Sequence, residues 1–340
     1  MAKSFLIALP VRNGGHHLRE CVASILSQSH RDFELVVLDN ASTDGTLEWL
    51  RQQTDSRLSV IASGEPLGIE ASWARIARLP IRHEFMTLVG HDDLLDEGFL
   101  EIMCALIDAQ PTAGLYNAHF RLIDTIGRTI RPCLPMPEIE SAAGFLASRL
   151  RFQRDSFGTG YVFRSADYVR IGGIPPYRKL LCADDALWMM LMKGSFKATV
   201  AARCFSYRVH SGSTSFAPDW RASYEGLSTY LDYLESQAGT DRNIAAVLRT
   251  DLPPYMQYWY RWAYFAAQDE GSRLEVKRQV EALARRVAPL LGHEPGADVA
   301  AALGDLQGMA AGLRYFLWRA VKWLRTRLWA FRFWPLPRGR

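Results

Sequence analysis

Short apolar runs alternate with amphipathic stretches along the first hundred residues of the chain. Four runs have the length and composition of buried strands, namely 4–11, 33–40, 57–63 and 85–90. Between and after them, apolar side chains recur every three or four residues, as on a helix with one buried face. This spacing predicts helices over 18–26, 42–53 and 68–78, and a further helix that begins at Asp96 and stops at Pro111.

This alternation predicts an α/β fold, in which a mostly parallel sheet is covered by helices on both faces. In such sheets, ligands bind beyond the carboxyl ends of the strands. Polar residues follow all four predicted strands at that end: Arg12 and Asn13, Asp39 and Asn40, 63–65, and 91–93. We therefore expect the functional site along this edge of the sheet.

The remainder of the chain divides into three parts. Residues 111–160 are irregular, and short strand-like pieces recur from 161 to 216. From 217 to 312 the sequence looks helical, with many Ala, Leu and aromatic residues. We expect a catalytic domain over 1–216, a helical region over 217–312 and a separate tail over 313–340.

The composition is that of an ordinary globular protein, with 340 residues of which 49% are hydrophobic and 22% charged. The five cysteines are odd in number and form no CxxC pattern, so neither a disulfide framework nor a zinc site is expected. No apolar segment reaches the roughly 18 residues of a spanning helix. These features predict a cytoplasmic protein with reduced thiols and no membrane span.

The basic charge of the chain is concentrated in its tail. The net charge is +4, yet residues 313–340 contain eight Arg or Lys and no acidic residue. Four tryptophans and an apolar helical stripe accompany these charges, a combination that suits the interface of an anionic membrane. Packing on the catalytic domain, an oligomer contact and single-stranded nucleic acid are the alternatives. We favour the membrane and expect no nucleic-acid partner.

Six motifs occur in an order that resembles family 2 glycosyltransferases, over about residues 4–216. They are "ALPVRNGGHHLRECVASILSQSHRDFELVVLDNASTDGT", "EPLGIEASWARIARL", "VGHDDLL", "GTGYVFR", "ADDALWMML" and "YRVHSGSTS". The resemblance implies a GT-A fold and an inverting enzyme that uses a nucleotide-diphosphate sugar. It also implies that a group of residues surrounds the nucleoside and its sugar: Pro10, Arg12, Asn13, Asp39, Ser42 and Gly68.

Asp39 in this group would accept hydrogen bonds from the edge of the base, because a carboxylate at a strand end has spare acceptors. The plainer interpretation is that Asp39, Asn40, Ser42 and Asp44 form a turn and a helix cap. Both can hold together.

By the same resemblance, Asp92 matches the last acid of the family's DXD-type motif and is the expected metal ligand. His210 would complete the metal shell around Mn²⁺ or Mg²⁺, which would neutralise the diphosphate. Asp93 would orient the loop or contact the sugar. The chain departs from the family at Gly90, where many members have the first acid. The alternative is that both acids only cap the following helix.

A second acid pair matches the family's ED motif, with Asp185 as the general base and Asp184 beside it. The alternative is an acidic pair favoured by the helix dipole. Arg208 would approach the diphosphate, since its guanidinium can bind it bidentately. Gly158 and Gly160 would let the backbone come close to the donor sugar or acceptor. Trp73 and Trp188 could stack on a sugar, although core packing is the expected role of each.

These expectations combine into one function. The chain is predicted to be a metal-dependent inverting glycosyltransferase acting on a glycan or lipid-linked acceptor, in bacterial lipopolysaccharide, O-antigen or capsule synthesis. It would bind peripherally to the cytoplasmic face of the inner membrane. A catalytically degenerate nucleotide-binding scaffold and a sugar-phosphate nucleotidyltransferase are the alternatives.

Overall fold

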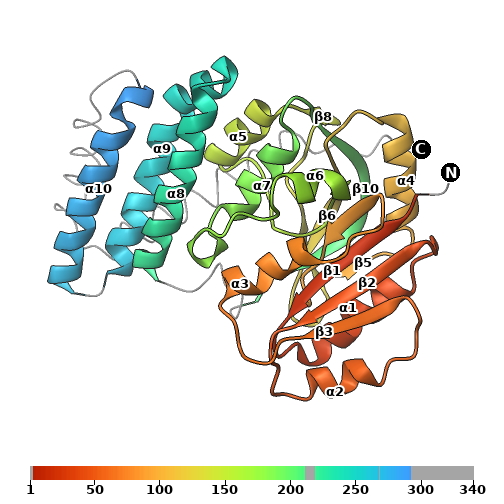
Figure 1. Ribbon diagram of the computed structural model, residues 1–340. Coiled ribbons are helices and arrows are strands. Elements are labelled where there is room, and N and C mark those ends of the chain that lie inside the picture. Colours follow the sequence, from red (N-terminus) through yellow and green to blue (C-terminus); the bar gives the residue numbers. More distant parts are fainter. Residues whose placement is uncertain (1–2, 211–218, 268, 292–340) are drawn as a thin grey trace. The chain divides into compact units, whose positions relative to one another are not determined.

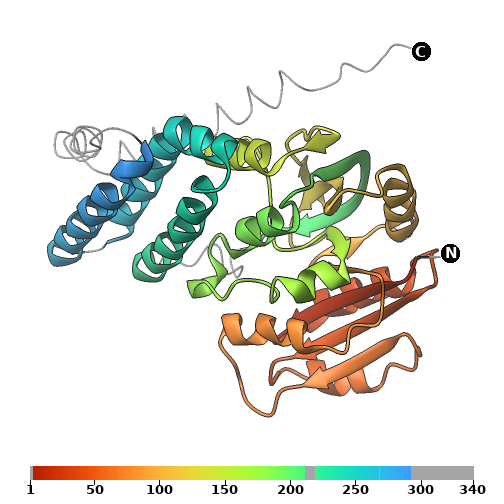
Figure 2. The ribbon, with the colours of Figure 1, turned by 45° about the horizontal axis from the view of Figure 1, so that its top comes forward.

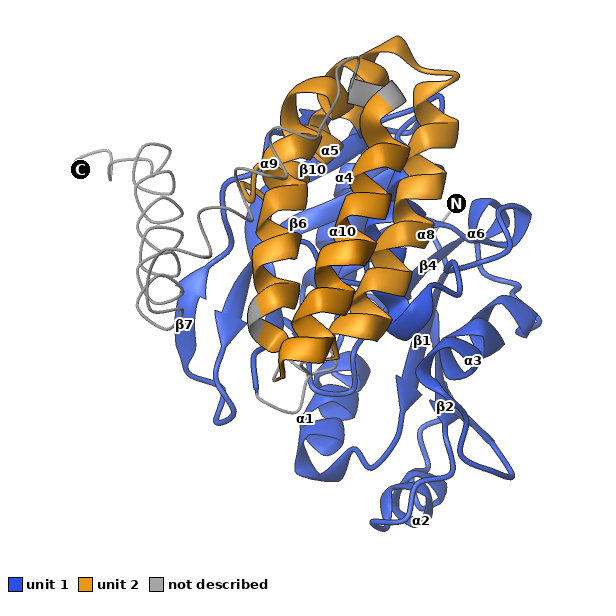
Figure 3. Ribbon diagram, turned by 90° about the vertical axis from the view of Figure 1, so that its left-hand side faces the viewer, with its two compact units in different colours: residues 1–142, 156–216 blue, residues 143–155, 217–340 orange. Residues whose placement is uncertain are grey.

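The computed structural model describes residues 3–210, 219–267 and 269–291. The chain forms two compact units (Figure 3): residues 1–142 and 156–216 belong to unit 1, and residues 143–155 and 217–340 to unit 2. The sequence predicted a division near 216. It gave no sign that 143–155 belongs with the C-terminal helices.

Parallel strands build the first half of the sheet in unit 1. Strand β1 (Phe5–Val11) pairs in parallel with β2 (Phe33–Asp39) and β4 (Phe85–Leu88), and β2 pairs in parallel with β3 (Leu58–Ala62). Figures 1 and 2 show these red to orange strands side by side. The carboxyl ends of β1, β2 and β4 therefore share one edge of the sheet, as expected.

The second half of the sheet is mixed. Among the described residues the sheet has ten strands in the order β3-β2-β1-β4-β9-β6-β10-β5, with β7 on β6 and β8 on β10. Strand β10 runs parallel to β6 and antiparallel to β5 and β8, and β9 is antiparallel to β4 and β6. The bounds are β5 (Leu94–Leu95), β6 (Leu115–Ile123), β7 (Thr129–Pro132), β8 (Ile139–Glu140), β9 (Tyr161–Arg164) and β10 (Lys197–Arg208).

Burial on both faces explains the continuous apolar sequence of β1, all seven residues of which are buried. One face packs on α1 (Gly15–Leu26), which buries Leu18, Cys21, Val22 and Ile25. The other helices of unit 1 are α2 (Thr46–Arg51), α3 (Ile69–Ala74), η1 (Arg75–Arg78), α4 (Phe99–Ala109), α6 (Ser165–Arg170), η2 (Arg178–Leu180) and α7 (Ala183–Leu191). The expected α/β fold is confirmed.

One predicted helix start is wrong. Helix α4 begins at Phe99, with Gly98 at the cap position, rather than at Asp96. The carboxylate of Asp96 instead pairs with the Arg121 guanidinium on β6. Among the described residues no side chain caps this helix, so the alternative that Asp92 and Asp93 serve as its caps is wrong.

The described part of unit 2 contains three long helices: α8 (Trp220–Ala238), α9 (Arg242–Ala266) and α10 (Glu270–Leu291). Helix α5 (Ala142–Leu150) precedes a segment that is tied to α9, since Arg151 Nε lies 2.8 Å from Asp251 Oδ1. Phe152 also packs on Tyr258, with ring centroids 4.5 Å apart. These contacts explain why residues 143–155 belong to unit 2.

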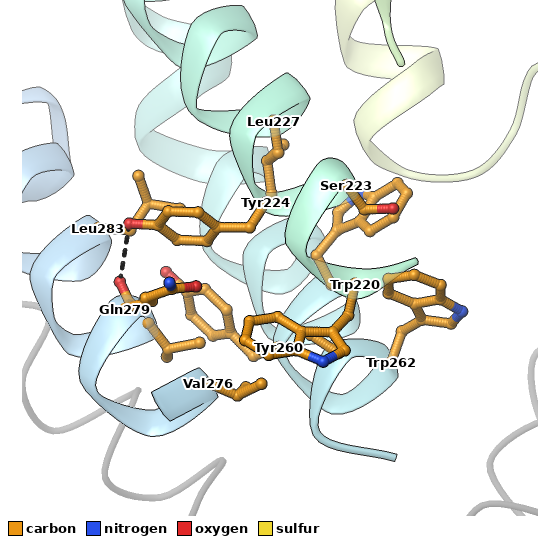
Figure 4. Close-up of a pocket in the computed structure, with 12 residues that line it drawn as sticks. Trp220, Ser223, Tyr224, Leu227, Tyr260, Trp262, Val276, Gln279 and Leu283 are labelled. Atoms are coloured by element: carbon orange, nitrogen blue, oxygen red, sulfur yellow. Dashed lines mark hydrogen bonds between the residues drawn. The ribbon is translucent and has the colours of Figure 1, made fainter. Parts of the chain in front are cut away.

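Aromatic side chains from α8, α9 and α10 line a hollow in unit 2 (Figure 4). Trp220 and Trp262 lie on one side of it, and the hydroxyl of Tyr224 donates to the backbone oxygen of Gln279 at 3.2 Å. None of the predicted site residues lines this hollow. The candidate site must therefore be sought at the sheet edge of unit 1.

Candidate functional site

The loops that follow β1 and β2 are bound to each other. The backbone N–H of Asn13 donates to Ser42 Oγ at 2.9 Å, and the N–H of Thr43 donates to Asn13 Oδ1 at 2.8 Å. Asp44 accepts from the N–H groups of Gly15 and Thr46, each at 3.1 Å. The predicted turn and the predicted site residues thus belong to one network.

Asp39 is fully buried at the end of β2. Its Oδ2 accepts from the N–H of Ser42 at 3.2 Å, whereas its Oδ1 has no hydrogen-bond partner among the described residues. Arg75 covers the strand end, because its guanidinium donates to the backbone oxygens of Asp39 at 2.8 Å and of Ile61 at 2.6 Å. Sequence reasoning missed Arg75, which lies inside the second motif and directly follows helix α3.

The remaining members of the nucleoside group differ in exposure. Pro10 is buried within β1, and Arg12 is exposed just after it. Gly68 precedes the first residue of α3, next to Leu67, whose backbone exchanges two hydrogen bonds with the side-chain amide of Asn40 at 2.8 and 3.0 Å. This amide clamp fixes Gly68 beside the end of β2.

The loop after β4 separates its two carboxylates. Asp93 is 1% exposed, and it accepts from Thr159 Oγ1 at 2.7 Å and from the N–H of Arg208 at 3.1 Å. Burial, reinforced by the neighbouring charge of Asp92, raises the pKa of Asp93 well above its usual value. Asp93 therefore ties the loop to β10 and to the segment before β9.

Asp92 is partly open to solvent, with its side chain 17% exposed, and its Oδ2 lies 2.7 Å from Nε2 of His210. The preceding residue, His91, is half-buried, and burial lowers the pKa of its imidazole. Asp92 and His210 provide one oxygen and one nitrogen donor that already converge, so their chemistry fits a divalent cation. No cluster of three or more His, Cys, Asp or Glu suited to a metal occurs in the described part of the chain.

The space around Gly90 is too small for the acid that many family members have there. A Cβ added there would lie 2.8 Å from Asp93 Oδ2 and 3.0 Å from Asp92 Oδ1. Real side chains essentially never approach so closely, and Asp93 is held by two hydrogen bonds. The carboxylates of the pair therefore occupy the space that the family's first acid would need.

The structure does not support the expected contact of Arg208 with a diphosphate. Its side chain is fully enclosed, and its Nε donates to the backbone oxygen of Asp92 at 2.8 Å. Its Nη2 donates to Glu20 Oε2 at 2.8 Å, and its Nη1 donates to the oxygens of Asp124 and Thr125, each at 3.1 Å. Because these donors are occupied and covered, the guanidinium holds segments of the protein together.

The second acid pair lies in the first turn of α7. Asp185 is 2% exposed, whereas Asp184 is half-buried and accepts from the N–H of Asp185 at 2.9 Å. A general base has to be reached by the acceptor hydroxyl, and Asp185 is the more enclosed carboxylate of the two. Asp184 is the more accessible carboxylate of the pair.

The glycines before β9 have different surroundings. A Cβ on Gly158 would lie 3.8 Å from both Asp184 Cβ and the half-buried Trp73 ring, so these three residues meet at one place. A Cβ on Gly160, whose φ is +78°, would lie 2.6 Å from the Phe205 ring. Core packing against Phe205 therefore favours glycine at this position, while the approach of a sugar to its backbone stays a prediction.

Trp188 is a core residue. Its indole is fully buried, stacks on Tyr161 with ring centroids 4.3 Å apart and donates to the backbone oxygen of Phe157 at 3.3 Å. This placement confirms that core packing is its role. Trp73 differs, because it is only half-buried and lies beside Gly158.

Tyr207 connects the two acid pairs. Burial raises its pKa, and the negative charges of Asp93, Asp92 and Asp184 raise it further. Carboxylates of both acid pairs therefore act electrostatically on one phenol, which stacks on Phe157 with ring centroids 3.5 Å apart. The acid pairs converge within unit 1, as the sequence-based hypothesis requires.

The predicted membrane tail, 313–340, lies outside the described residues, as does the end of the last motif, from 211 onward. Within the described ranges, no helix is both long and apolar enough to cross a membrane.

Comparisons with known proteins agree with this geometry. A model of the family "Glycosyl transferase family 2" matches residues 6–162. Glycosyltransferase GlyG of Streptococcus pneumoniae is 28% identical over 121 residues, which cover 34% of this chain and 40% of GlyG. The putative teichuronic acid biosynthesis glycosyltransferase TuaG of Bacillus subtilis is 24% identical over 230 residues, which cover 66% of this chain and 86% of TuaG.

Solved structures show the same fold. S. aureus TarS 1–349 in complex with UDP-GlcNAc aligns with a TM-score of 0.65 at 17% identity, over 87% of this chain and 88% of that one. Mannosyltransferase PcManGT from Pyrobaculum calidifontis, in complex with GDP-Man and Mn²⁺, aligns with a TM-score of 0.54 at 15% identity, over 97% of this chain and 86% of that one. The expected GT-A fold is confirmed, and the resemblance to glycosyl transferase family 2 is borne out by the family match over residues 6–162, somewhat less than half of the chain.

Proposed function

We propose that this chain is an inverting glycosyltransferase that moves a sugar from a nucleotide-diphosphate sugar to a hydroxyl of a glycan or lipid-linked acceptor. The observation that carries the proposal is that the two acid pairs lie at one place: Thr159 donates to Asp93 at 2.7 Å, and a Cβ on the preceding Gly158 would lie 3.8 Å from Asp184 Cβ. The match of residues 6–162 to the family supports it, and solved proteins of the same fold hold UDP-GlcNAc and GDP-Man.

Asp184 is the proposed general base, in place of Asp185. The acceptor oxygen attacks C1 of the donor sugar while the bond from C1 to the diphosphate oxygen breaks. The hydroxyl proton passes to the Asp184 carboxylate, and the electron pair of the broken bond leaves with the nucleoside diphosphate. A single displacement inverts the configuration at C1, and a well-placed base contributes about 10² to 10⁴ in rate.

Asp92 and His210 are the proposed ligands of Mn²⁺ or Mg²⁺. When bound, such a cation would neutralise the charge that develops on the leaving diphosphate. A site with two protein donors is usual where substrate phosphates supply further ligands. Support comes from the 2.7 Å approach of the two donor atoms and from the Mn²⁺ in PcManGT.

The nucleoside would bind where the loops after β1 and β2 meet. The Oδ1 of Asp39, which has no hydrogen-bond partner among the described residues, is the proposed acceptor for the base edge. Arg12, exposed beside it, has a guanidinium that can reach phosphate or ribose. Asn13, Ser42 and the buried Pro10 shape the loop, and Gly68, which has no side chain, lies at the start of α3.

The physiological setting is proposed to be bacterial surface-polysaccharide synthesis, such as lipopolysaccharide, O-antigen or capsule. TuaG, named for teichuronic acid biosynthesis, supports this setting. The basic aromatic tail 313–340 would hold the enzyme at the cytoplasmic face of the inner membrane. Liposome flotation tests the tail: we expect the full chain, but not a form ending at Gly312, to float with anionic vesicles. Equal behaviour of both would remove this part of the proposal.

A donor panel tests the transferase proposal. UDP-, GDP- and dTDP-sugars are offered with Mn²⁺, and the release of nucleoside diphosphate is measured for the wild type and for Asp184→Asn. Release from one donor that is lost in the variant supports the proposal, and the anomeric configuration of the product tests inversion.

A nucleotide-binding scaffold is the second candidate, and the crowded position of Gly90 favours it. Since Asp92 and Asp93 exclude the family's first acid, a contact to the donor is missing. The scaffold predicts binding of a nucleotide, seen as a raised melting temperature, with no release above background from any donor.

A further inference from the structure

Arg208 joins three segments of unit 1. It is the last residue of β10, and its side chain is completely enclosed. Its guanidinium donates to the loop after β4 through the Asp92 backbone oxygen, to α1 through Glu20, and to the turn after β6 through Asp124 and Thr125. An arginine with this set of partners fixes the distances between all three segments.

The same strand end carries His210 toward Asp92. The backbone N–H of Arg208 binds Asp93 at 3.1 Å, and two residues later His210 Nε2 lies 2.7 Å from Asp92 Oδ2. The two donors of this pair come from different segments, the β4 loop and the end of β10. Arg208 is the side chain that bridges those segments directly beside the pair.

We propose that Arg208 is a positioning residue that sets the distance between the Asp92 carboxylate and the His210 imidazole, and that Glu20 holds Arg208 in this role. This assignment rests on one part of the proposed function, namely that Asp92 and His210 form the cation site. A planar fork is required, because one guanidinium contacts three segments at once, whereas the point charge of a lysine cannot.

Glu20 makes the idea testable without opening the core. It is the ionic partner of Arg208 in the described residues, while its own side chain is 52% exposed. Replacing Glu20 by glutamine keeps its size and leaves the buried Arg208 charge with carbonyl acceptors only. Mutation of residues that orient metal ligands without contacting the metal typically changes metal affinity by about 10- to 100-fold.

The experiment compares Arg208→Lys and Glu20→Gln with the wild type in the full chain. The matched control is Arg121→Lys, because Arg121 is a half-buried arginine on the neighbouring strand β6 that binds Asp96 and Ser206 rather than the backbone of Asp92. Binding of Mn²⁺ with UDP is measured by electron paramagnetic resonance, and stability by thermal unfolding. We expect affinity to fall about 10- to 100-fold in Arg208→Lys, less in Glu20→Gln, and not in the control. Unchanged Mn²⁺ affinity in folded Glu20→Gln and Arg208→Lys overturns the assignment, even if their melting temperatures fall.

A second readout separates this idea from the metal proposal. The ¹⁵N chemical shift of His210 Nε2 reports its hydrogen bond to Asp92 without any cation. If the wild type binds no Mn²⁺, the proposed metal role fails, and the His210 chemical shift alone tests the positioning role. A shift that differs from the wild type in Glu20→Gln but not in Arg121→Lys supports positioning. A shift in Glu20→Gln that equals the wild-type value overturns it. Should Arg208→Lys not fold, Glu20→Gln alone decides the question by both readouts.

Discussion

The two acid pairs of the site are built on different local structures and yet share one arrangement. Asp92 and Asp93 follow a strand, whereas Asp184 and Asp185 begin a helix. In each pair one carboxylate is buried, Asp93 at 1% and Asp185 at 2% exposure, and its neighbour is partly open. Successive side chains point in different directions on either backbone, so adjacent acids in a sequence should not be assigned equal roles.

In the first pair, the buried and the partly exposed carboxylate have different roles. Asp93 is satisfied by Thr159 and by the Arg208 backbone, and these bonds hold the loop in place. Asp92 keeps its carboxylate at the open side, next to His210. A buried acid thus supports the loop from which its neighbour faces the ligand.

The largest expected effect concerns the second pair. Asp184→Asn should lower kcat about 10²- to 10⁴-fold with little change in melting temperature, because it removes the accessible base. Asp185→Asn should mainly lower stability, by about 1–3 kcal/mol, because it alters an enclosed polar group. Steady-state kinetics and thermal unfolding of both variants test the comparison. The reverse pattern, with kcat lost only in Asp185→Asn, would restore the sequence-based choice.

Restoring the missing acid should destabilise the first pair. Gly90→Asp forces a Cβ against both carboxylates and adds a third negative charge, so we expect a loss of about 1–3 kcal/mol in the free energy of unfolding. Gly98→Asp is the control, since a Cβ at Gly98 meets nothing within 4 Å. Equal denaturation midpoints for the two variants would contradict the crowding at Gly90.

Removing the hydroxyl partner of Asp93 should have a similar or smaller effect. Thr159→Val keeps the shape of the side chain but removes the donor 2.7 Å from Asp93 Oδ2, at a cost of about 1–3 kcal/mol. Thr43→Val, at an exposed threonine, should change stability by less than about 0.5 kcal/mol. Urea unfolding of both variants checks the difference, and an equal response would show that the buried hydrogen bond adds nothing.

The pH dependence of Asp93 follows from its raised pKa. The folded state keeps its proton to higher pH than the unfolded state, whose carboxyl titrates near 3.8. As pH rises above that value, ionisation therefore favours the unfolded chain, and this contribution to stability falls until the folded pKa is passed. The stability of the wild type relative to Asp93→Asn should decrease over this window in urea titrations. An increase would mean that Asp93 is stabilised as a carboxylate.

Asp55 gives the smallest effect and the opposite sign. Hydrogen bonds from the Arg57 side chain lower the pKa of Asp55 to about 2, from an ordinary value of 3.8. Its ionised form favours folding, so the contribution is present above about pH 4 and is lost as pH falls through about 2. Because solvent screens the pair, Asp55→Asn should cost only about 1 kcal/mol at neutral pH. The difference between wild type and variant should disappear near pH 2.

Local patterns were sufficient for much of the fold. Strands β1 to β4 and helix α1 were predicted because continuous or periodic burial leaves a direct trace in the sequence. Strand β6 was missed, since its partners β9 and β10 come later in the chain. The ion pair of Arg121 with Asp96 was missed for the same reason, and the helix start was placed three residues early.

For the site, residue types along the chain were enough to identify the groups that carry the chemistry: paired acids at the ends of apolar runs, a glycine where a third acid is usual, and a histidine after the last strand. The folded arrangement was needed to show which acid of each pair is accessible and that Arg208 is enclosed rather than open to a ligand. This division arises because burial depends on residues distant in sequence. Thr159, Glu20 and Phe205 set the surroundings of Asp93, Arg208 and Gly160, and no local pattern records those contacts.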